Sequence, residues 1–286
     1  MDLTPLQITS FQDKILTWYT VNKRDLPWRH THDPYKILLS EIMSQQTQIS
    51  RVIPKYDKWL KELPTIQSLA NAPLARVLGL WSGLGYNRRA LYLQQTAKII
   101  VQKYCNCFPE TMQELKKLPG IGEYTASAVL CFAFNHQIPI IDTNIRKVIV
   151  MQICQNYRGR DKEINLNRAI KFKTKNERTI LQIAQEILPL GQAYDWNQAL
   201  MDYAALELKK EKIPVPKQSK LLGSDRWYRG QIVKLLLQHQ TTSEIQLFNI
   251  LKKEGDFTQE RYKKIINNLQ KDKLIMVTNN KEINLS

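Results

Sequence analysis

Apolar residues recur at helical spacing along most of the chain, and few segments alternate as a strand would. Residues 7–21 are typical, because Ile8, Phe11, Ile15 and Trp18 return every three or four positions and would share one helix face. The same pattern predicts helices after Asp33-Pro34 and over residues 49–62, 65–71, 73–80, 87–104, 111–117, 123–134, 142–153, 179–188 and 194–210. The sequence therefore predicts a mainly α-helical fold.

The pattern changes at residues 212–223, which hold Pro214, Pro216 and several lysines. We interpret this stretch as a linker, because proline and charge without apolar periodicity disfavour a packed element. It would separate a larger domain, residues 1–211, from a smaller one, residues 224–286.

The smaller domain has its own pattern of elements. Helices are predicted over residues 226–238, from Thr242 onward and over 258–271, and Asn279-Asn280 separates two short β-prone runs as a hairpin turn would. Three helices and a terminal hairpin are typical of a winged helix-turn-helix. Such a module binds either DNA or another protein, and the sequence leaves both roles open.

The charge of the chain favours a polyanionic partner. Lys and Arg number 42 against 26 Asp and Glu, a formal net charge of +16, which suits nucleic acid or an anionic membrane. A merely lysine-rich soluble surface is the alternative. Residues 156–178, with eight Lys or Arg against three Asp or Glu, are expected to form a solvated loop or an exposed helix.

Membrane insertion and secretion are not expected. No apolar run approaches the roughly 18 residues of a membrane span, and the first residues lack the pattern of a secretory signal. The four cysteines, Cys105, Cys107, Cys131 and Cys154, have a spacing that fits neither a zinc site nor a disulfide framework. We interpret them as ordinary thiols of a cytoplasmic protein.

A glycine-containing turn at Leu118–Thr125 is the first candidate for chemistry. Gly120 and Gly122 would let the backbone N–H groups of a turn between two helices approach a phosphate. Asp142 follows one helix and one turn later, and its carboxylate could face the molecule to which that phosphate belongs.

A carboxylate within an apolar run is the second candidate. Glu41 follows Ile37-Leu38-Leu39 and precedes Ile42-Met43, so it is expected to be partly buried. Burial disfavours the charged form of a carboxylate, which is the condition for a general acid at neutral pH; an exposed or capping glutamate is the alternative. Beyond it lie Gln45, Gln46 and Gln48, whose amides suit the edges of bases.

These motifs together resemble one family of DNA repair enzymes. The chain is similar over about residues 5–210 to the MutY-type adenine DNA glycosylases of the helix-hairpin-helix superfamily, which also contains endonuclease III. The resemblance implies a two-lobed helix-hairpin-helix fold, here followed by the winged-helix-like module. It rests on motifs that occur in order at Lys23 to Arg29, Asp33 to Tyr35, Ser40 to Met43, Gln45 to Gln48, Trp81 to Tyr86, Leu118 to Thr125, Asp142 to Asn144 and Asn197 to Asp202.

The resemblance implies roles for five residues in catalysis. Glu41 matches the acid that protonates the departing purine, and Asp142 matches the carboxylate that stabilises the positive sugar, as in glycoside hydrolysis. Asn144 would orient Asp142, and Arg29 would lie beside the reacting nucleotide. Tyr124 stands where endonuclease III-type enzymes carry a Schiff-base lysine. The resemblance therefore implies hydrolysis of the bond between base and sugar, without cleavage of the strand.

Other positions are implied to contact DNA. The target base must leave the stack before reaction, and Gln46 and Tyr86 match the positions that probe the duplex and fill the gap. The remaining matches line the adenine pocket, at Arg24, Trp28, Ile49 and Gln198, or hold phosphates, at Gly120, Gly122, Thr125, Arg88 and Arg89.

Two features depart from the family pattern. Members usually carry four cysteines that bind an iron–sulfur cluster, whereas Leu208, Val215, Gln218 and Ser224 stand near those positions. Because such clusters need thiolates, no cluster and no other metal or cofactor is expected. Members also usually end in a MutT-like domain that senses 8-oxoguanine, and residues 224–286 are too short for one, which leaves that recognition open.

The expected function is therefore base-excision repair. The protein, as a monomer associated with the nucleoid, would excise adenine mispaired with guanine or 8-oxoguanine from double-stranded DNA. Removal of thymine or uracil from mismatches with guanine is the first alternative, which Tyr124 permits. A non-catalytic DNA-binding protein on a glycosylase fold is the second, and the retention of both Glu41 and Asp142 argues against it.

Overall fold

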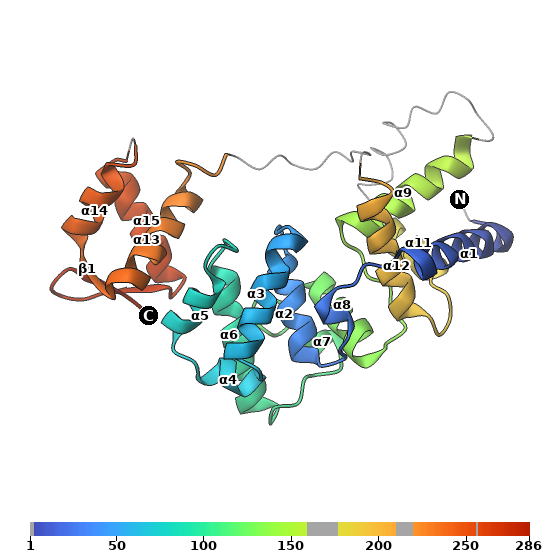
Figure 1. The fold of residues 1–286 in the computed structure, drawn as a ribbon, viewed down its shortest axis with the longest axis horizontal. Coiled ribbons are helices and arrows are strands. Elements are labelled where there is room, and N and C mark those ends of the chain that lie inside the picture. The colour runs from blue at the N-terminus through green and yellow to red at the C-terminus, as the bar shows by residue number, and fades with distance from the viewer. Residues whose placement is uncertain (1–2, 159–176, 210–219, 256) are drawn as a thin grey trace. The chain divides into compact units, whose positions relative to one another are not determined.

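Helices make up most of the chain in the computed structural model, which describes residues 3–158, 177–209, 220–255 and 257–286 (Figure 1). The residues cluster into two compact units. Unit 1 comprises Met1–Leu38, Glu110–Lys117 and Ile121–Val215, and unit 2 comprises Leu39–Pro109, Leu118–Gly120 and Pro216–Ser286. The loop or exposed helix expected over 156–178 lies outside the described residues except at its ends, which belong to helices.

Unit 1 is built from helices that come from three separate stretches of the chain. They are α1 (Pro5–Asn22), the 3-10 helix η1 (Pro27–Arg29), α7 (Met112–Leu115), α8 (Glu123–Phe134), α9 (Thr143–Arg158), α11 (Glu177–Glu186) and α12 (Ala193–Leu206). Helix α2 (Pro34–Ser44) begins in unit 1 and ends in unit 2.

Helix α12 forms the centre of unit 1, where it packs against α1, α8 and α9. The ring of Phe11 on α1 meets Trp196 on α12 edge-on, with centroids 5.5 Å apart. Helix α8 is buried at every position from Thr125 to Phe132, as expected for a helix that is apolar on all sides. The helical spacing read from the sequence is therefore realised as a packed core.

Unit 2 contains a second helical core. Its helices before the C-terminal segment are α3 (Ile49–Glu62), α4 (Ile66–Asn71), α5 (Leu74–Trp81) and α6 (Arg88–Lys103). Helices α4 and α5 pack against α6, and α3 packs against α5. Trp59 and Trp81 meet edge-on in this core, with ring centroids 5.8 Å apart. Both side chains are fully buried.

The C-terminal module, residues 224–286, has the predicted three helices and hairpin and one additional strand. In order it contains α13 (Asp225–His239), β1 (Thr241–Ser243), α14 (Glu244–Lys252), α15 (Gln259–Lys271), β2 (Ile275–Val277) and β3 (Glu282–Leu285). The strands form an antiparallel sheet in the order β1-β3-β2, as in a winged helix. The predicted boundary at residues 212–223 falls largely outside the described residues and stays a prediction.

The additional strand corrects one expectation. The helix predicted from Thr242 begins at Glu244, and Thr242 instead pairs with Ile283. Ser243 ends the strand and caps the helix, because its hydroxyl accepts a hydrogen bond from the N–H of Gln246 at 3.3 Å. A three-residue strand is too short to show the alternation by which a strand is recognised.

Among the described residues, no helix is both long enough and apolar enough to cross a membrane.

Candidate active site

Glu41 is a buried carboxylate on α2. Its exposed fraction is 9%, and the preceding Ser40 is 1% exposed. The apolar neighbours Leu39 and Ile42 are also buried, so the burial expected from the local sequence is confirmed. Burial disfavours the charged form of a carboxyl group, which is a condition that general acids exploit.

Asp142 caps the N-terminus of α9. One carboxylate oxygen accepts a hydrogen bond from the N–H of Ile145 at 2.6 Å, and the other accepts one from the Nδ2 of Asn144 at 2.8 Å. Burial raises the pKa of Asp142 above its ordinary value, although these two hydrogen bonds oppose the shift. The cap and the amide fix the orientation of the carboxylate, as the prediction for Asn144 requires.

Asn197 fixes the segment that leads to Asp142, a role that the sequence did not reveal. Its Oδ1 accepts a hydrogen bond from the N–H of Ile140 at 2.9 Å, and its Nδ2 donates to the carbonyl of Ile138 at 3.1 Å and to that of Ala193 at 2.8 Å. Asn197 is 1% exposed. The amide therefore ties α12 to the segment that leads into α9.

The hairpin predicted from Gly120 and Gly122 lies between α7 and α8, as expected. Gly120 has φ +76°, and Gly122 is the N-cap of α8 with φ −96°. Tyr124, the second residue of α8, is half-buried. Thr125 is 2% exposed, and the phosphate contact implied for it stays a prediction.

Replacing Gly120 by alanine is expected to lower the stability of unit 2 by about 1–3 kcal/mol. A Cβ there would lie 3.0 Å from the Cβ of Tyr92, in addition to the cost of the positive φ. Gly79, inside α5 with open space around it, offers a matched control, since alanine there should stabilise the helix by about 0.5–1 kcal/mol. Denaturant unfolding of both variants measures this, and equal signs would contradict the expectation.

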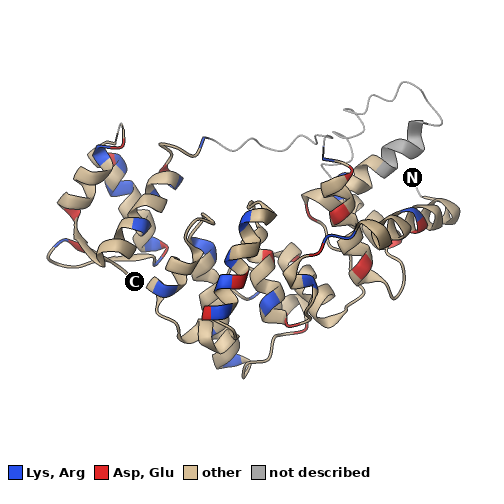
Figure 2. Cartoon of the chain, viewed as in Figure 1, with Lys and Arg blue, Asp and Glu red and all other residues tan. Residues whose placement is uncertain are grey.

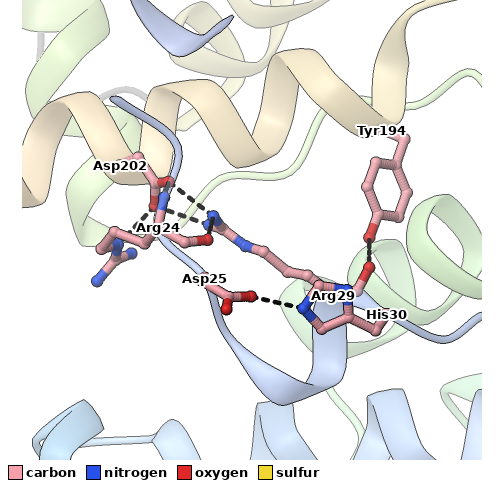
Figure 3. A network of polar contacts seen from close by, with 6 residues as sticks. All are labelled: Arg24, Asp25, Arg29, His30, Tyr194 and Asp202. Atoms are coloured by element: carbon pink, nitrogen blue, oxygen red, sulfur yellow. Dashed lines mark hydrogen bonds and ion pairs between the residues drawn. The ribbon is translucent and has the colours of Figure 1, made fainter. Parts of the chain in front are cut away.

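A buried ion network joins α12 to the segment that precedes α2 (Figure 3). The carboxylate of Asp202 is fully buried. It accepts hydrogen bonds from both terminal nitrogens of Arg29, each at 2.7 Å, and from the N–H and Nε of Arg24 at 2.9 and 2.6 Å. The Arg29 guanidinium also donates to the carbonyl of Arg24 at 2.9 Å. Both arginines, predicted to lie at the nucleotide, are therefore held by one carboxylate.

The rest of Figure 3 shows how this segment continues. Tyr194 donates its hydroxyl hydrogen to the carbonyl of Arg29 at 3.3 Å, and His30 contacts Asp25 at 2.5 Å on the surface. Arg29 is 8% exposed at its side chain and its Nε is buried without a hydrogen-bond partner. The guanidinium is thus committed to the protein, and the predicted place of Arg29 beside a nucleotide stays a prediction.

Two exposed turns of unit 2 carry the residues predicted to probe DNA. Gln46, in the turn between α2 and α3, has φ +54°, and Tyr86, in the turn between α5 and α6, has φ +49° and is 39% exposed. Left-handed backbone is unfavourable for such residues. Both turns therefore need support from their surroundings.

Arg89 supplies that support to both turns. One terminal nitrogen donates to the carbonyls of Ile42 and Gln45 at 2.7 and 2.6 Å, and the other to those of Leu84 and Gly85 at 3.0 and 3.2 Å. Burial lowers the pKa of Arg89 to about 10. The side chain that the sequence assigned to a phosphate thus has its donors on backbone carbonyls, and it acts as a pin between the two turns.

Replacing Arg89 by lysine is expected to destabilise unit 2 by about 2 kcal/mol, because one ammonium cannot reach both turns and buried carbonyls would lose charged donors. Arg76→Lys is the matched control, because this arginine is half-exposed and pairs with Glu62 on the surface. A loss no larger than that of the control would show that Arg89 does not hold the turns.

The remaining predicted residues divide between core and surface. Trp28 and Gln198 are buried, at 8% and 5% exposed. Gln45 and Ile49 are half-buried, and Gln48 is exposed as the N-cap of α3. Arg88, the first residue of α6, donates to Asp272 of the C-terminal module at 2.5 Å.

The residues at the expected iron–sulfur positions do not fit such a cluster. Leu208 has no donor side chain, and Ser224 is used as the N-cap of α13, where its hydroxyl accepts from the N–H of Trp227 at 3.3 Å. Val215 and Gln218 lie outside the described residues. Cys131 is buried on α8, and burial raises the pKa of its thiol to about 12, so this thiol is a poor source of thiolate.

Glu41 and Asp142 lie in different compact units, Glu41 in unit 2 and Asp142 in unit 1. Lys and Arg, blue in Figure 2, are spread over the helices of both units, so the positive charge seen in the sequence is not confined to one of them.

Comparisons with known proteins agree with the resemblance. Residues 39–175 match the family of HhH-GPD superfamily base excision DNA repair proteins. The adenine DNA glycosylase of Buchnera aphidicola subsp. Baizongia pistaciae is 42% identical over 197 residues, covering 68% of this chain and 52% of that protein. That of subsp. Acyrthosiphon pisum is 32% identical over 253 residues, covering 86% of this chain and 68% of that protein.

A solved structure agrees with the fold. The structure of a thermostable thymine-DNA glycosylase has a TM-score of 0.62 and 29% sequence identity, and the match covers 77% of this chain and 93% of that one. The mainly α helix-hairpin-helix fold is therefore confirmed. The chain spans about half the length of the first of the curated relatives and 68% of the second. It belongs to the family of adenine DNA glycosylases within the HhH-GPD superfamily of base excision DNA repair proteins.

Proposed function

We propose that this protein is a monofunctional DNA glycosylase that removes mispaired adenine from double-stranded DNA. The observation that carries the proposal is the buried Glu41 on α2, in a chain that belongs to the adenine DNA glycosylases. A buried glutamate can hold a proton for the base, which is what departure of a purine requires.

The proposed reaction uses one carboxyl group as an acid and another as a carboxylate. The adenine leaves the base stack, and Glu41 transfers its proton to N7, so that the base departs neutral as the bond from its N9 to C1′ breaks. Asp142 stabilises the positive charge that develops on the sugar. Water then adds to C1′ and gives up a proton, which restores the acid. Thus one water is consumed, and the products are adenine and an abasic site.

The setting of Asp142 supports its proposed role. Because burial raises the pKa of this carboxyl group, its charged form is poorly solvated. A poorly solvated anion gains more than a hydrated one from a cation that forms beside it. Capping by the N–H of Ile145 and the amide of Asn144 keeps the group aimed without neutralising it.

The turns pinned by Arg89 suit the recognition of a mismatch. Gln46 and Tyr86 are exposed at positions of left-handed backbone, and we assign to them the filling of the gap and the probing of the opposite base. Aromatic rings stack on bases with about 1–3 kcal/mol each. The opposite base is proposed to be guanine or 8-oxoguanine.

Tyr124 is the reason to propose hydrolysis without strand cleavage. Cleavage of the strand after base removal needs an amine that forms a Schiff base with the sugar, and a phenol cannot form one. Substitution of lysine for Tyr124 is expected to add weak strand nicking, detectable as a protein–DNA adduct trapped by borohydride. Tyr124→Phe, which adds no amine, is the control and should give no adduct. Absence of an adduct with the lysine variant would argue against the placement of Tyr124 at C1′.

A panel of labelled duplexes tests the proposed substrate. Adenine opposite 8-oxoguanine, adenine opposite guanine, thymine opposite guanine and uracil opposite guanine are incubated with the full chain, and abasic sites are revealed by alkali. We expect cleavage of the adenine duplexes alone. Activity confined to thymine or uracil would replace the proposal by the mismatch thymine glycosylase that Tyr124 permits, and activity on none would favour a DNA-binding protein without catalysis.

We also propose that the protein works as a monomer without an iron–sulfur cluster. The side chains of Leu208, Val215, Gln218 and Ser224 supply no thiolate, and clusters of this kind are held by thiolates. Iron and sulfide analysis of the purified protein should find neither in stoichiometric amount. A stoichiometric cluster would require ligands from elsewhere in the chain.

A further inference from the structure

Helix α15 presents a polar, lysine-bearing face to solvent. Five of its exposed residues form what we call the α15 face: Lys263, Lys264, Asn267, Asn268 and Lys271. Lys264, Asn267 and Lys271 follow one another at intervals of three and four positions, so they share one stripe of the helix. The helix thus has one exposed polar side and one buried side.

The opposite side of α15 holds it in the C-terminal module. Tyr262, Ile265, Ile266 and Leu269 are each at most 3% exposed, and the helix packs against α13. Helix α14 and α15 follow one another as the two helices of a helix-turn-helix, and the second helix of that motif is the one that enters the major groove of DNA. The exposed stripe therefore lies where a recognition helix carries its contacts.

The lysines of the α15 face are not used inside the protein. Among the described residues, Lys263, Lys264 and Lys271 make no ion pair, whereas nearby arginines of the module do. Arg229 pairs with Asp272, and Arg261 pairs with Asp225 at 2.7 Å. Within α15, which is described throughout, the only carboxylate is Glu260 in its first turn. The positive charge of this face is therefore available to an outside partner.

The hairpin beside α15 adds similar groups. Asn279, Asn280 and Lys281 are exposed in the turn between β2 and β3, and Lys273 is exposed just before β2. Amide side chains can donate to and accept from base edges, and lysines contact phosphates. The exposed side chains named on the α15 face and in the hairpin turn are lysines and amides, although Met276 on β2 is also exposed. A surface rich in lysine favours a nucleic acid over a protein, whose interfaces are depleted in lysine.

The module is continuous with the turn that we assign to DNA. Arg88, next to that turn, donates to Asp272 at the end of α15 at 2.5 Å. Arg226 on α13 donates a hydrogen bond to the hydroxyl of Tyr86, and its guanidinium lies 5.2 Å from the centre of that ring. A duplex probed by Tyr86 would thus pass close to the module.

We propose that the α15 face is a second binding surface for duplex DNA, which lengthens the contact beyond the mismatch. This rests on the proposed action of the protein on DNA. The lysines hold phosphates of the flanking duplex, and Asn267 and Asn268 face the groove. The partner is thus double-stranded DNA.

The test compares two double variants of the full chain. Lys264→Gln with Lys271→Gln removes two charges from the α15 face, and Lys220→Gln with Lys234→Gln removes two exposed charges elsewhere, one just before the module and one on α13. Dissociation constants for an undamaged duplex are measured over a range of salt concentrations. For the first variant we expect binding weakened about tenfold or more at low salt, and a salt dependence of log K reduced by about 2. The second variant should bind as the parent protein does.

The dissociation constants of the two variants decide whether the α15 face binds DNA. Equal binding by the parent and the first variant, or equal losses in both variants, would overturn the proposal and leave the face to a protein partner or to solvent. Melting curves establish that both variants are folded, which is expected because all four lysines are exposed. Because the duplex is undamaged, a failure to excise adenine would refute the proposed function without affecting this measurement.

Discussion

Replacing Asp202 by asparagine is expected to reduce the free energy of unfolding by about 3–5 kcal/mol. The carboxylate of Asp202 is fully buried and receives hydrogen bonds from Arg24 and Arg29. An amide has the same shape but no charge, so the guanidinium of Arg29, only 8% exposed at its side chain, would lose its counter-ion without gaining water. Removing one member of such a group costs much more than the intact group contributes.

The effect of Asp202 should depend on pH in a defined direction. Burial alone would raise the pKa of Asp202, but the hydrogen bonds from Arg29 and Arg24 outweigh it and hold the pKa below its ordinary value. A group with a depressed folded-state pKa stabilises the protein above its unfolded pKa, about 3.9 for Asp, and the contribution is lost as pH falls through the folded pKa. The difference in the free energy of unfolding between parent and variant should therefore be largest at neutral pH and should decrease below about pH 4.

Denaturant unfolding at several pH values measures both the loss of stability and its dependence on pH. Asp195→Asn is the matched control, because this residue lies on the same helix but is exposed, and its change should stay within about 0.5 kcal/mol. The double variant Arg29→Met with Asp202→Leu should recover part of the loss, since it removes both buried charges. A loss below about 1 kcal/mol for Asp202→Asn would mean that the network has alternative partners.

Features of the fold that depend on neighbouring residues could be predicted from the sequence, whereas contacts between residues far apart in the chain could not. Helices α3 and α8 begin and end at the residues that the sequence predicted, because spacing of apolar residues and turn residues are local signals. The burial of Glu41 could also be predicted, since its neighbours along the chain are apolar. By contrast, the partners Arg24 and Asp202 are 178 positions apart, and no local pattern connects them.

Contacts between distant segments also explain why the surroundings of Arg89 and Thr125 were not predicted. The family resemblance implied a phosphate contact for Arg89, but its donors reach carbonyls up to 47 positions away. The resemblance implied the same for Thr125, which is buried because α8 is covered on all sides from Thr125 to Phe132. Side-chain direction in a site depends on which elements pack together, and only the folded structure supplies that.

Replacing Glu41 by glutamine is expected to reduce the rate of adenine excision by about 10²–10⁴-fold. The amide fills the same volume in the same buried place but has no acidic proton for the leaving base. The proposed reaction would then have to expel adenine as an anion, which raises the barrier for breaking the bond to C1′. Binding of the mismatched duplex should change little, because we assign the contacts to phosphates and to the opposite base to other residues.

Two measurements on the same variant separate chemistry from binding. Single-turnover excision with protein in excess reports the rate of bond cleavage, and gel retardation on a duplex with a non-cleavable adenine analogue reports affinity. Glu110→Gln is the matched control, since it makes the same change at an exposed glutamate and should leave both values unaltered. If the Glu41 variant kept most of its excision rate, the proton would have to come from another group, and the burial of Glu41 would need a structural explanation instead. A large loss of rate with unchanged affinity would be the result that a general acid requires, because a residue that only supported the fold would weaken both.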